Sequence, residues 1–352
     1  RIILNELAAQ NPNGAWTFSS VENFLQGIPS QFQADFPGTD TIRGLRTSLI
    51  GGYIQDDFRM RSNLTLNLGV RYEMSTVVSE VNGKLANLRN LTDPQASIGA
   101  PYYNNPTRKN FAPRIGFAWD PFRDGKTAVR GGFGMFDIAP LPYLFLTPIV
   151  RSAPFFKGGQ LSNPPPSSFP NQVSQLLLPS SLTASHIEFN PRPAYRMQWN
   201  LNIQRQLTRT VALTLGYVGS SGVHLARQER DTDVVPASLV KFDSALNALV
   251  FPIPAPGTKP QRINPNFGQI LGHEWSGGSN YHGLQANLVQ RPTKDLSYQL
   301  SYTWAKSIDN GSNSMGGVSL DAGNTAPTPW AFNPRIQRGV SDFNVPHNFV
   351  AN

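Results

Sequence analysis

Apolar and polar side chains alternate along several segments of this chain. In residues 64–73 every even position is apolar, and the odd positions carry Thr, Asn, Gly, Arg and Glu. Successive side chains of a β-strand point to opposite faces, so such a strand has one apolar and one polar face. The same alternation predicts further strands at residues 110–120, 126–136, 195–207, 211–219, 281–290 and 295–306. A strand at 47–58 is also expected, although its inward and outward phase is ambiguous, and another begins near His347.

The connections between these strands are alternately very short and very long. Short turns are expected at 59–63, 121–125, 208–209 and 291–294, and the second contains the Asp-Gly pair typical of hairpins. The long connections are expected at 75–109, 137–193, 220–279 and 308–345. Soluble domains rarely contain structureless loops beyond about 15 residues, whereas bacterial barrels combine short periplasmic turns with long extracellular loops. The pattern therefore predicts an all-β fold, a transmembrane antiparallel β-barrel; a soluble β-sandwich is the alternative.

Composition narrows the class of protein further. The chain has no cysteine, which excludes a disulfide scaffold and thiolate chemistry and is compatible with an oxidising compartment. Its net charge of +8 comes from basic residues that are scattered singly, so no nucleic-acid partner is expected. It begins at Arg1 rather than at Met and ends inside an apparent strand, which suggests a fragment. One short helix is expected at Ser20–Leu25, capped by Ser19 or Ser20.

The polar faces of the strands supply the first set of candidate binding residues. In a barrel they would point into the lumen: Arg71, Glu73, Arg114, Arg130, Arg196, Gln198, Asn200, Asn202, Gln204 and Gln206. These residues would either satisfy the polar surface of a plug by hydrogen bonds and ion pairs or guide an anionic or polyhydroxylated ligand. We favour the first role.

The long connections supply the second set, because loops commonly carry binding residues. Five aromatic side chains are expected to be exposed there and to stack on a sugar or a chelate: Tyr102, Tyr103, Phe155, Phe156 and Trp275. No metal site is expected, because the five histidines do not occur at metal-ligand spacing. No catalytic triad or phosphate-binding loop is found either, so neither a cofactor nor an enzymatic activity is expected.

Several segments also resemble one protein family. Tyr53–Phe58 followed by Leu64–Glu73 is similar to the YxQDDW…LTLNLGLRYE hairpin of TonB-dependent outer-membrane receptors, and Phe111–Pro121, continuing into Thr127–Phe136, is similar to their sPRlGfaw hairpin. Further segments resemble the Oar-like branch, which is abundant in acidobacteria: Gln198–Leu207, Gly216–Ser220, Tyr302–Ser307 and Arg338–Phe343. The resemblance covers roughly residues 16–352.

This resemblance implies a location in the bacterial outer membrane, in contact with its lipid. It implies a 22-stranded barrel, of which this chain would supply about nine strands, together with an N-terminal plug and often a carboxypeptidase-regulatory-like domain. No segment of the chain matches the plug or the TonB box. The implied function is import of an extracellular ligand (a carbohydrate, a metal chelate or a peptide) driven by the TonB-ExbB-ExbD system through the plug.

Two other functions remain open. The first is an outer-membrane adhesin or protein-export component on the same barrel, in which the long Pro- and Gly-rich loops bind other proteins or a matrix. The second is a soluble β-sandwich or propeller enzyme, which would be extracted into buffer without detergent.

Overall fold

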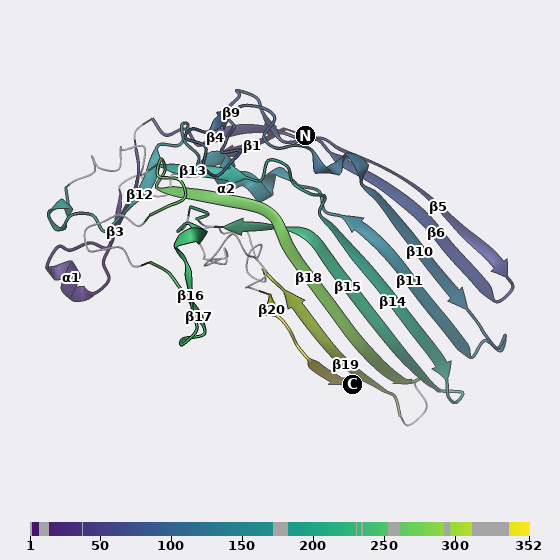
Figure 1. The fold of residues 1–352 in the computed structure, drawn as a ribbon. Coiled ribbons are helices and arrows are strands. Elements are labelled where there is room, and N and C mark those ends of the chain that lie inside the picture. The colour runs from purple at the N-terminus through teal and green to yellow at the C-terminus, as the bar shows by residue number, and fades with distance from the viewer. Residues whose placement is uncertain are drawn as a thin grey trace.

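The fold is dominated by one large sheet of long strands (Figure 1). A computed structural model describes residues 2–6, 14–36, 38–171, 182–229, 231–233, 235–252, 261–291, 296–311 and 338–352. Within these residues the 11-stranded sheet has the order β20-β19-β18-β15-β14-β11-β10-β6-β5, with β13 beside β18 and β21 beside β19. Its strands are β5 (Leu49–Arg61), β6 (Leu64–Ser75), β10 (Phe111–Trp119), β11 (Thr127–Asp137), β13 (Thr183–Ile187), β14 (Tyr195–Gln206), β15 (Val211–Glu229), β18 (Gln269–Gln290), β19 (Tyr298–Asp309), β20 (Gly339–Val340) and β21 (His347–Ala351).

Nine of these strands form an antiparallel meander in chain order, from β5 to β21, as the alternation predicts. Its two edges are β5 and, beyond β19, β21, so the described residues form an open, curved wall (Figure 1). The register also settles the phase of β5. Ile54 lies opposite Val70 on the apolar face, and Gln55 lies opposite Gly69 on the polar face.

The short turns form where the sequence predicts them. Between β10 and β11, the carboxylate of Asp120 accepts the backbone N–H of Arg123 (2.9 Å) and of Gly125 (3.0 Å). Both of these residues have positive φ, 58° and 64°, which is the conformation that glycine adopts at no steric cost. The turn between β14 and β15 is closed by the Thr208 hydroxyl, which accepts the N–H of Val211 (3.0 Å). Most of the expected turn at 291–294 lies outside the described residues.

The connection expected at 220–279 is shorter than predicted, because both flanking strands run on. β15 continues to Glu229 and β18 begins at Gln269. The pairing continues through two register shifts, after Val223 and after Leu225, to Glu229 opposite Gly272. These extensions contain Ser, Gly and charged residues and do not alternate, because they pack on other protein segments and not between an apolar and a polar medium. Alternation alone therefore could not predict them.

The connections expected at 75–109 and 137–193 are not structureless. They contain β7 (Ser79–Glu80), β8 (Ala86–Asn87), β9 (Ser97–Ile98), η1 (Pro106–Lys109), η2 (Pro142–Phe145), α2 (Leu146–Val150), β12 (Gly158–Ser162), η3 (Pro166–Ser168) and β13. Together with the outer extensions of β15 and β18 they form what we call the loop body, at one end of the long strands (Figure 1). Its core includes Leu85, Phe145, Ile149 and Ile187.

The remaining elements are small. They are β1 (Ile2–Glu6), β2 (Ala15–Thr17), α1 (Val21–Leu25), β3 (Gln31–Asp35), β4 (Ile42–Arg46), η6 (Ala237–Leu239), β16 (Lys241–Asp243) and β17 (Ala248–Val250). The helix α1 confirms the helix expected at Ser20–Leu25. The Ser20 hydroxyl caps it by accepting the N–H of Asn23 (3.1 Å). No helix among the described residues is both long and apolar enough to cross a bilayer.

Candidate functional site

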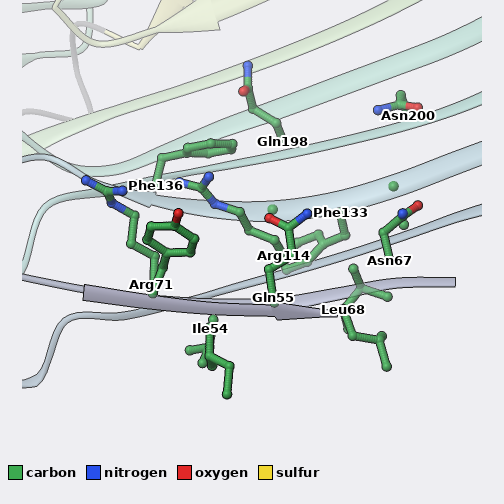
Figure 2. A pocket seen from close by; sticks show the side chains of 17 residues that line it. Ile54, Gln55, Asn67, Leu68, Arg71, Arg114, Phe133, Phe136, Gln198 and Asn200 are labelled. Atoms are coloured by element: carbon green, nitrogen blue, oxygen red, sulfur yellow. The ribbon is translucent and has the colours of Figure 1, made fainter. Parts of the chain in front are cut away.

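The register of β5, β6, β10, β11 and β14 brings many of the predicted polar residues to one face of the wall. Directly paired residues of antiparallel strands lie on the same face. Arg114 lies opposite Gly69 on one side and Gly134 on the other, and Gly134 in turn lies opposite Gln198. Arg71, Arg114, Gln198 and Asn200 therefore share a face, as predicted. Figure 2 shows Arg71, Arg114 and Gln198 on one side of the strands and Ile54 and Leu68 on the other.

The centre of this polar face is hollowed to a volume of about 580 Å³. Four glycines on neighbouring strands line the hollow, and each takes a place where another residue would project a side chain: Gly69, Gly116, Gly132 and Gly134. A Cβ added at Gly134 would lie 3.1 Å from the ring of Phe136, which is tighter than ordinary contact. The hollow exists because glycine occupies these positions, and it is rimmed by longer polar side chains.

The two arginines of the rim have different neighbours. The Arg71 guanidinium pairs with the Glu73 carboxylate (Nη2 to Oε1, 2.7 Å). Arg114 instead lies over the ring of Phe136, 4.7 Å from its centroid, a cation–π geometry that leaves its N–H groups available for other acceptors. Asn67 donates to Asp57 (2.6 Å). The rim can therefore donate hydrogen bonds to carbonyl, hydroxyl or carboxylate oxygens from several strands at once.

The other polar residues predicted for this face lie outside the hollow. Arg130 lies opposite Asn202, and Arg196 opposite Phe136, so both are on the polar face. Both arginine side chains are exposed. Asn202 donates to Asn200 at the edge of the hollow (3.1 Å). Gln204 and Gln206 continue the same face toward the turn after β14.

The predicted exposure of the loop aromatics is wrong for four of the five. Tyr102, Tyr103, Phe156 and Trp275 are between 0% and 3% exposed, and only Phe155 is half-buried, with the Arg43 guanidinium 5.5 Å from its ring centroid. The physical reason is that the connections fold into the loop body, whose core needs large apolar side chains. Burial also raises the pKa of Tyr102 and Tyr103, because desolvation disfavours the phenolate.

Sequence reasoning missed several residues of the hollow. The alternation does not assign Gln55 to a face, because the phase of its strand is ambiguous, and it predicts only strands around Asn67 and Phe136. The glycines carry the clearest signal, since Gly69, Gly116, Gly132 and Gly134 all stand at polar-face positions of the alternation. Only the register shows that they are neighbours. Among the described residues there is no group of three or more His, Cys, Asp or Glu able to hold a metal ion.

The whole chain, residues 1–352, matches the model of a protein family described as an outer membrane beta barrel domain. The chain belongs to this family. The apolar face of this outer-membrane barrel domain is therefore its lipid-facing side, and the polar face with its hollow lines the lumen. The antiparallel β fold and the outer-membrane location predicted from the sequence are confirmed.

Solved structures provide a second comparison. Similar ones include the outer membrane transporter YddB from Escherichia coli, with a TM-score of 0.43, 14% identity, and coverage of 76% of this chain and 25% of that one. The siderophore receptor PirA from Acinetobacter baumannii has a TM-score of 0.41 and 11% identity, with coverage of 91% and 43%. The ferripyoverdine receptor from Pseudomonas aeruginosa has a TM-score of 0.37 and 14% identity, with coverage of 77% and 24%. The chain thus spans about a quarter to under half of their lengths. No curated protein matches the sequence.

Proposed function

We propose that this barrel domain is part of a receptor that binds a ligand outside the cell and imports it by TonB-coupled transport. The hairpin segments Tyr53–Phe58, Leu64–Glu73 and Phe111–Pro121, which resemble those of TonB-dependent receptors, support the assignment. The Oar-like branch, the 22-strand barrel, the plug and a preceding carboxypeptidase-regulatory-like domain belong to the same proposal. The imported ligand would be a carbohydrate, a metal chelate or a peptide.

The observation that carries the proposal is the polar hollow in the lumen wall. A water-filled pore needs no fitted surface, whereas a lumen closed by a protein domain must offer hydrogen-bond partners to that domain's buried polar groups. A glycine floor lets another backbone approach the wall closely. Arg114 and Asn200 on the rim are suited to pair with backbone carbonyls or carboxylates of such a domain. Guiding an anionic or polyhydroxylated ligand is the second role open to the same residues.

The first experiment tests energy coupling directly. The natural full-length protein is purified in detergent, and its binding to the purified periplasmic domain of TonB is measured by calorimetry. Saturable binding, lost when the TonB-box segment of the full-length protein is deleted, is expected. Absence of binding to the intact protein would contradict the TonB-coupled function and favour a passive pore or an adhesin.

A second experiment tests the role of the hollow. The full-length protein is reconstituted into liposomes, and arabinose entry is followed by swelling. A plugged barrel should give slow swelling, and Arg114→Ala should accelerate it by loosening the plug. Arg130→Ala is the matched control, because Arg130 is an exposed arginine on the same face outside the hollow. Equal swelling rates in both variants and in the parent protein would contradict a role of the hollow in holding the plug.

The hairpin formed by β16 and β17 supports the adhesin alternative. The hairpin β16–β17 leaves Phe242 and Leu246 exposed, at 63% and 69%. Deleting the long connection 137–193 would not test adhesion alone. That connection supplies Phe145 and Ile187 to the core of the loop body, so its deletion would also disturb folding. Deletion of 237–250 is the better variant. Lost cell adhesion with unchanged TonB binding would support an adhesive function for this hairpin.

A further inference from the structure

The outer extension of β18 has different partners from the part of β18 that crosses the wall. Residues 279–290 pair with β15 on one side and with β19 on the other. Outside Ser279 the pairing with β19 ends within the described residues, and 269–273 pair instead with β13 of the loop body. β18 bends between these two parts (Figure 1). The outer extension can therefore open while the wall stays closed.

The bend contains glycine and an interrupted register. The pairing of β15 with β18 shifts after Val223 and again after Leu225. A Cβ added at Gly277 would lie 2.7 Å from the carbonyl oxygen of Leu225, so the two backbones approach more closely there than a side chain would allow. Irregularities of this kind bend a strand and disrupt the ladder of hydrogen bonds. They limit how far an opening of the outer extension spreads into the wall.

Three carboxylates and one guanidinium meet around β18 just outside the bend. Glu274 lies opposite Arg227 in the register, and Glu229 stands two positions further along β15 on the same face. Arg227 Nη2 lies 2.9 Å from Glu229 Oε1. On the other side of β18, the Glu188 carboxylate accepts the backbone N–H of Trp275 (2.8 Å). We call Glu188, Glu229, Glu274 and Arg227 the carboxylate cluster.

The carboxylate cluster lies outside the membrane and is shielded from water. Ser279 stands eleven positions before Gln290, where β18 meets the short turn. At about 3.3 Å per residue and a tilt of about 40°, these positions span roughly 28 Å of height, which exceeds an apolar band of about 25 Å. Glu274 lies beyond Ser279. It is half-buried, and Glu229 is 4% exposed.

The charges of the cluster act on Glu274 in opposite directions. Burial and then the other two carboxylates raise the pKa of Glu274 to about 7, against the opposing effect of Arg227. Burial lowers the pKa of the neighbouring His186 and His273, so both imidazoles are neutral near pH 7. Because the pKa of Glu274 lies above its ordinary value of 4.5, folding favours the protonated form. Its contribution to stability is full below about pH 4.5, falls as the pH rises to about 7, and is absent above that.

We propose that the carboxylate cluster makes the contact between the loop body and β18 sensitive to pH. In a mildly acidic medium Glu274 carries a proton, and the pair of Arg227 with Glu229 holds the cluster together. In an alkaline medium three carboxylates are ionised around one guanidinium, and their repulsion weakens the contacts of β13 and Glu188 with β18. The long loops of such a barrel face the outside of the cell, so the contact responds to the external pH. This inference rests on the barrel fold and the strand register, and it is independent of the proposed TonB coupling.

The test measures backbone hydrogen exchange, corrected for intrinsic rates, in the full-length protein in neutral detergent at pH 5.5 and pH 8.5. The N–H groups of Glu188 and Trp275 report on the contact, because the hydrogen bonds of both join Glu188 to β18. Residues 281–290 report on the wall. The parent protein is compared with Glu274→Gln, whose side chain has the same size and does not ionise. Folding of each variant is checked by the mobility shift on heating in gel electrophoresis.

In the parent protein, opening at Glu188 and Trp275 should be about tenfold or more frequent at pH 8.5 than at pH 5.5, with unchanged opening at 281–290. Glu274→Gln should remove most of this difference. Asp233→Asn is the matched control and should retain it, because Asp233 is another buried carboxyl group with a raised pKa but is not part of the cluster. A parent protein without the pH dependence would overturn the proposal, whether or not the variants fold. So would a pH dependence that Glu274→Gln leaves unchanged.

Discussion

At the scale of single residues, glycines shape the candidate site as much as charged residues do. Gly132 and Gly134 leave room for the hollow because they have no side chain. Arg114 and Gln198 were predictable from alternation, because a period of two assigns a face to every residue of a strand. The burial of Tyr102 and Tyr103 was not predictable, because an aromatic pair in a long connection has the same local pattern whether it is exposed or buried.

Asp233 provides a residue-scale prediction about pH. Its Oδ1 accepts the N–H of Asn264 (2.7 Å), Arg262 Nη1 lies 3.8 Å from Oδ2, and burial raises the pKa of the carboxyl group to about 6. A folded-state pKa above the unfolded value means that folding favours the protonated form. The contribution to stability is full below about pH 4, falls as the pH rises to about 6, and is absent above that.

We therefore expect Asp233→Asn to slow hydrogen exchange at Asn264 and Ile270 at pH 7.5. The free energy of opening should rise by up to about 3 kcal/mol relative to the parent protein at that pH and should be unchanged at pH 4. Hydrogen exchange at Asn264 and Ile270, corrected for intrinsic rates, measures the difference. Asp231→Asn is the control, because it removes the ion pair of Asp231 with Arg262 (2.9 Å) and should reduce protection at neutral pH. A less protected Asp233 variant at pH 7.5 would contradict the argument.

At the scale of elements, alternation predicts a strand well only where the strand separates lipid from the lumen. β14 and β10 were predicted to within about two residues, which is the usual uncertainty of strand and helix ends. The outer parts of β15 and β18 were missed because both of their faces meet protein and the period of two disappears. The parallel strand β13 was missed for a related reason, since its five residues pair with β18 far along the chain.

The two faces of β14 can be distinguished by single cysteines, since the chain has none of its own. A bimane label on Leu201→Cys should be quenched strongly by doxyl-labelled lipid, because Leu201 lies on the lipid-facing side. The same label on Asn200→Cys, one position along, should be quenched weakly. The comparison is made in proteoliposomes of the full-length protein, and equal quenching at both positions would contradict the assigned faces.

The outer extensions of β15 and β18 contain a buried ion pair whose loss should act locally. Arg227 Nη2 lies 2.9 Å from Glu229 Oε1, and the side chains are 2% and 5% exposed. Replacing Arg227 by Met removes this positive charge from beside the buried Glu229 carboxylate, which costs about 3–5 kcal/mol. Faster hydrogen exchange at 183–187 and 269–273 is expected, with unchanged exchange at 281–290.

The double variant Arg227→Met/Glu229→Leu is the control for this prediction. It removes both charges together, so most of the protection at 183–187 should return. If the double variant exchanged as fast as the single one, packing and not charge would be the cause.

At the scale of the whole molecule, the described wall has two open edges and one apolar face. All of β5 is exposed, including Ile54 at 71% and Tyr53 at 76%, and so is β21 at the other edge. Exposed strand edges pair with other chains. Residues 1–352 expressed alone are therefore expected to form large, polydisperse assemblies in detergent.

This prediction is checked by size-exclusion chromatography with light scattering. Replacing Ile54 and Phe58 by Lys on the edge strand should shift the distribution toward smaller species, because edge lysines disfavour pairing. A monodisperse, soluble chain would contradict the membrane-wall arrangement and return the soluble sandwich to consideration.

The parallel pairing of β13 with β18 has a mechanical consequence. Five consecutive residue pairs, from Thr183 with Gln269 to Ile187 with His273, join the loop body to a strand that continues into the membrane wall. A force directed along β18 loads all of these backbone hydrogen bonds in shear at once, so they share the load and do not open one after another. An object pulling on the loop body from outside the cell would therefore transmit tension into the barrel before the loop body detached from it.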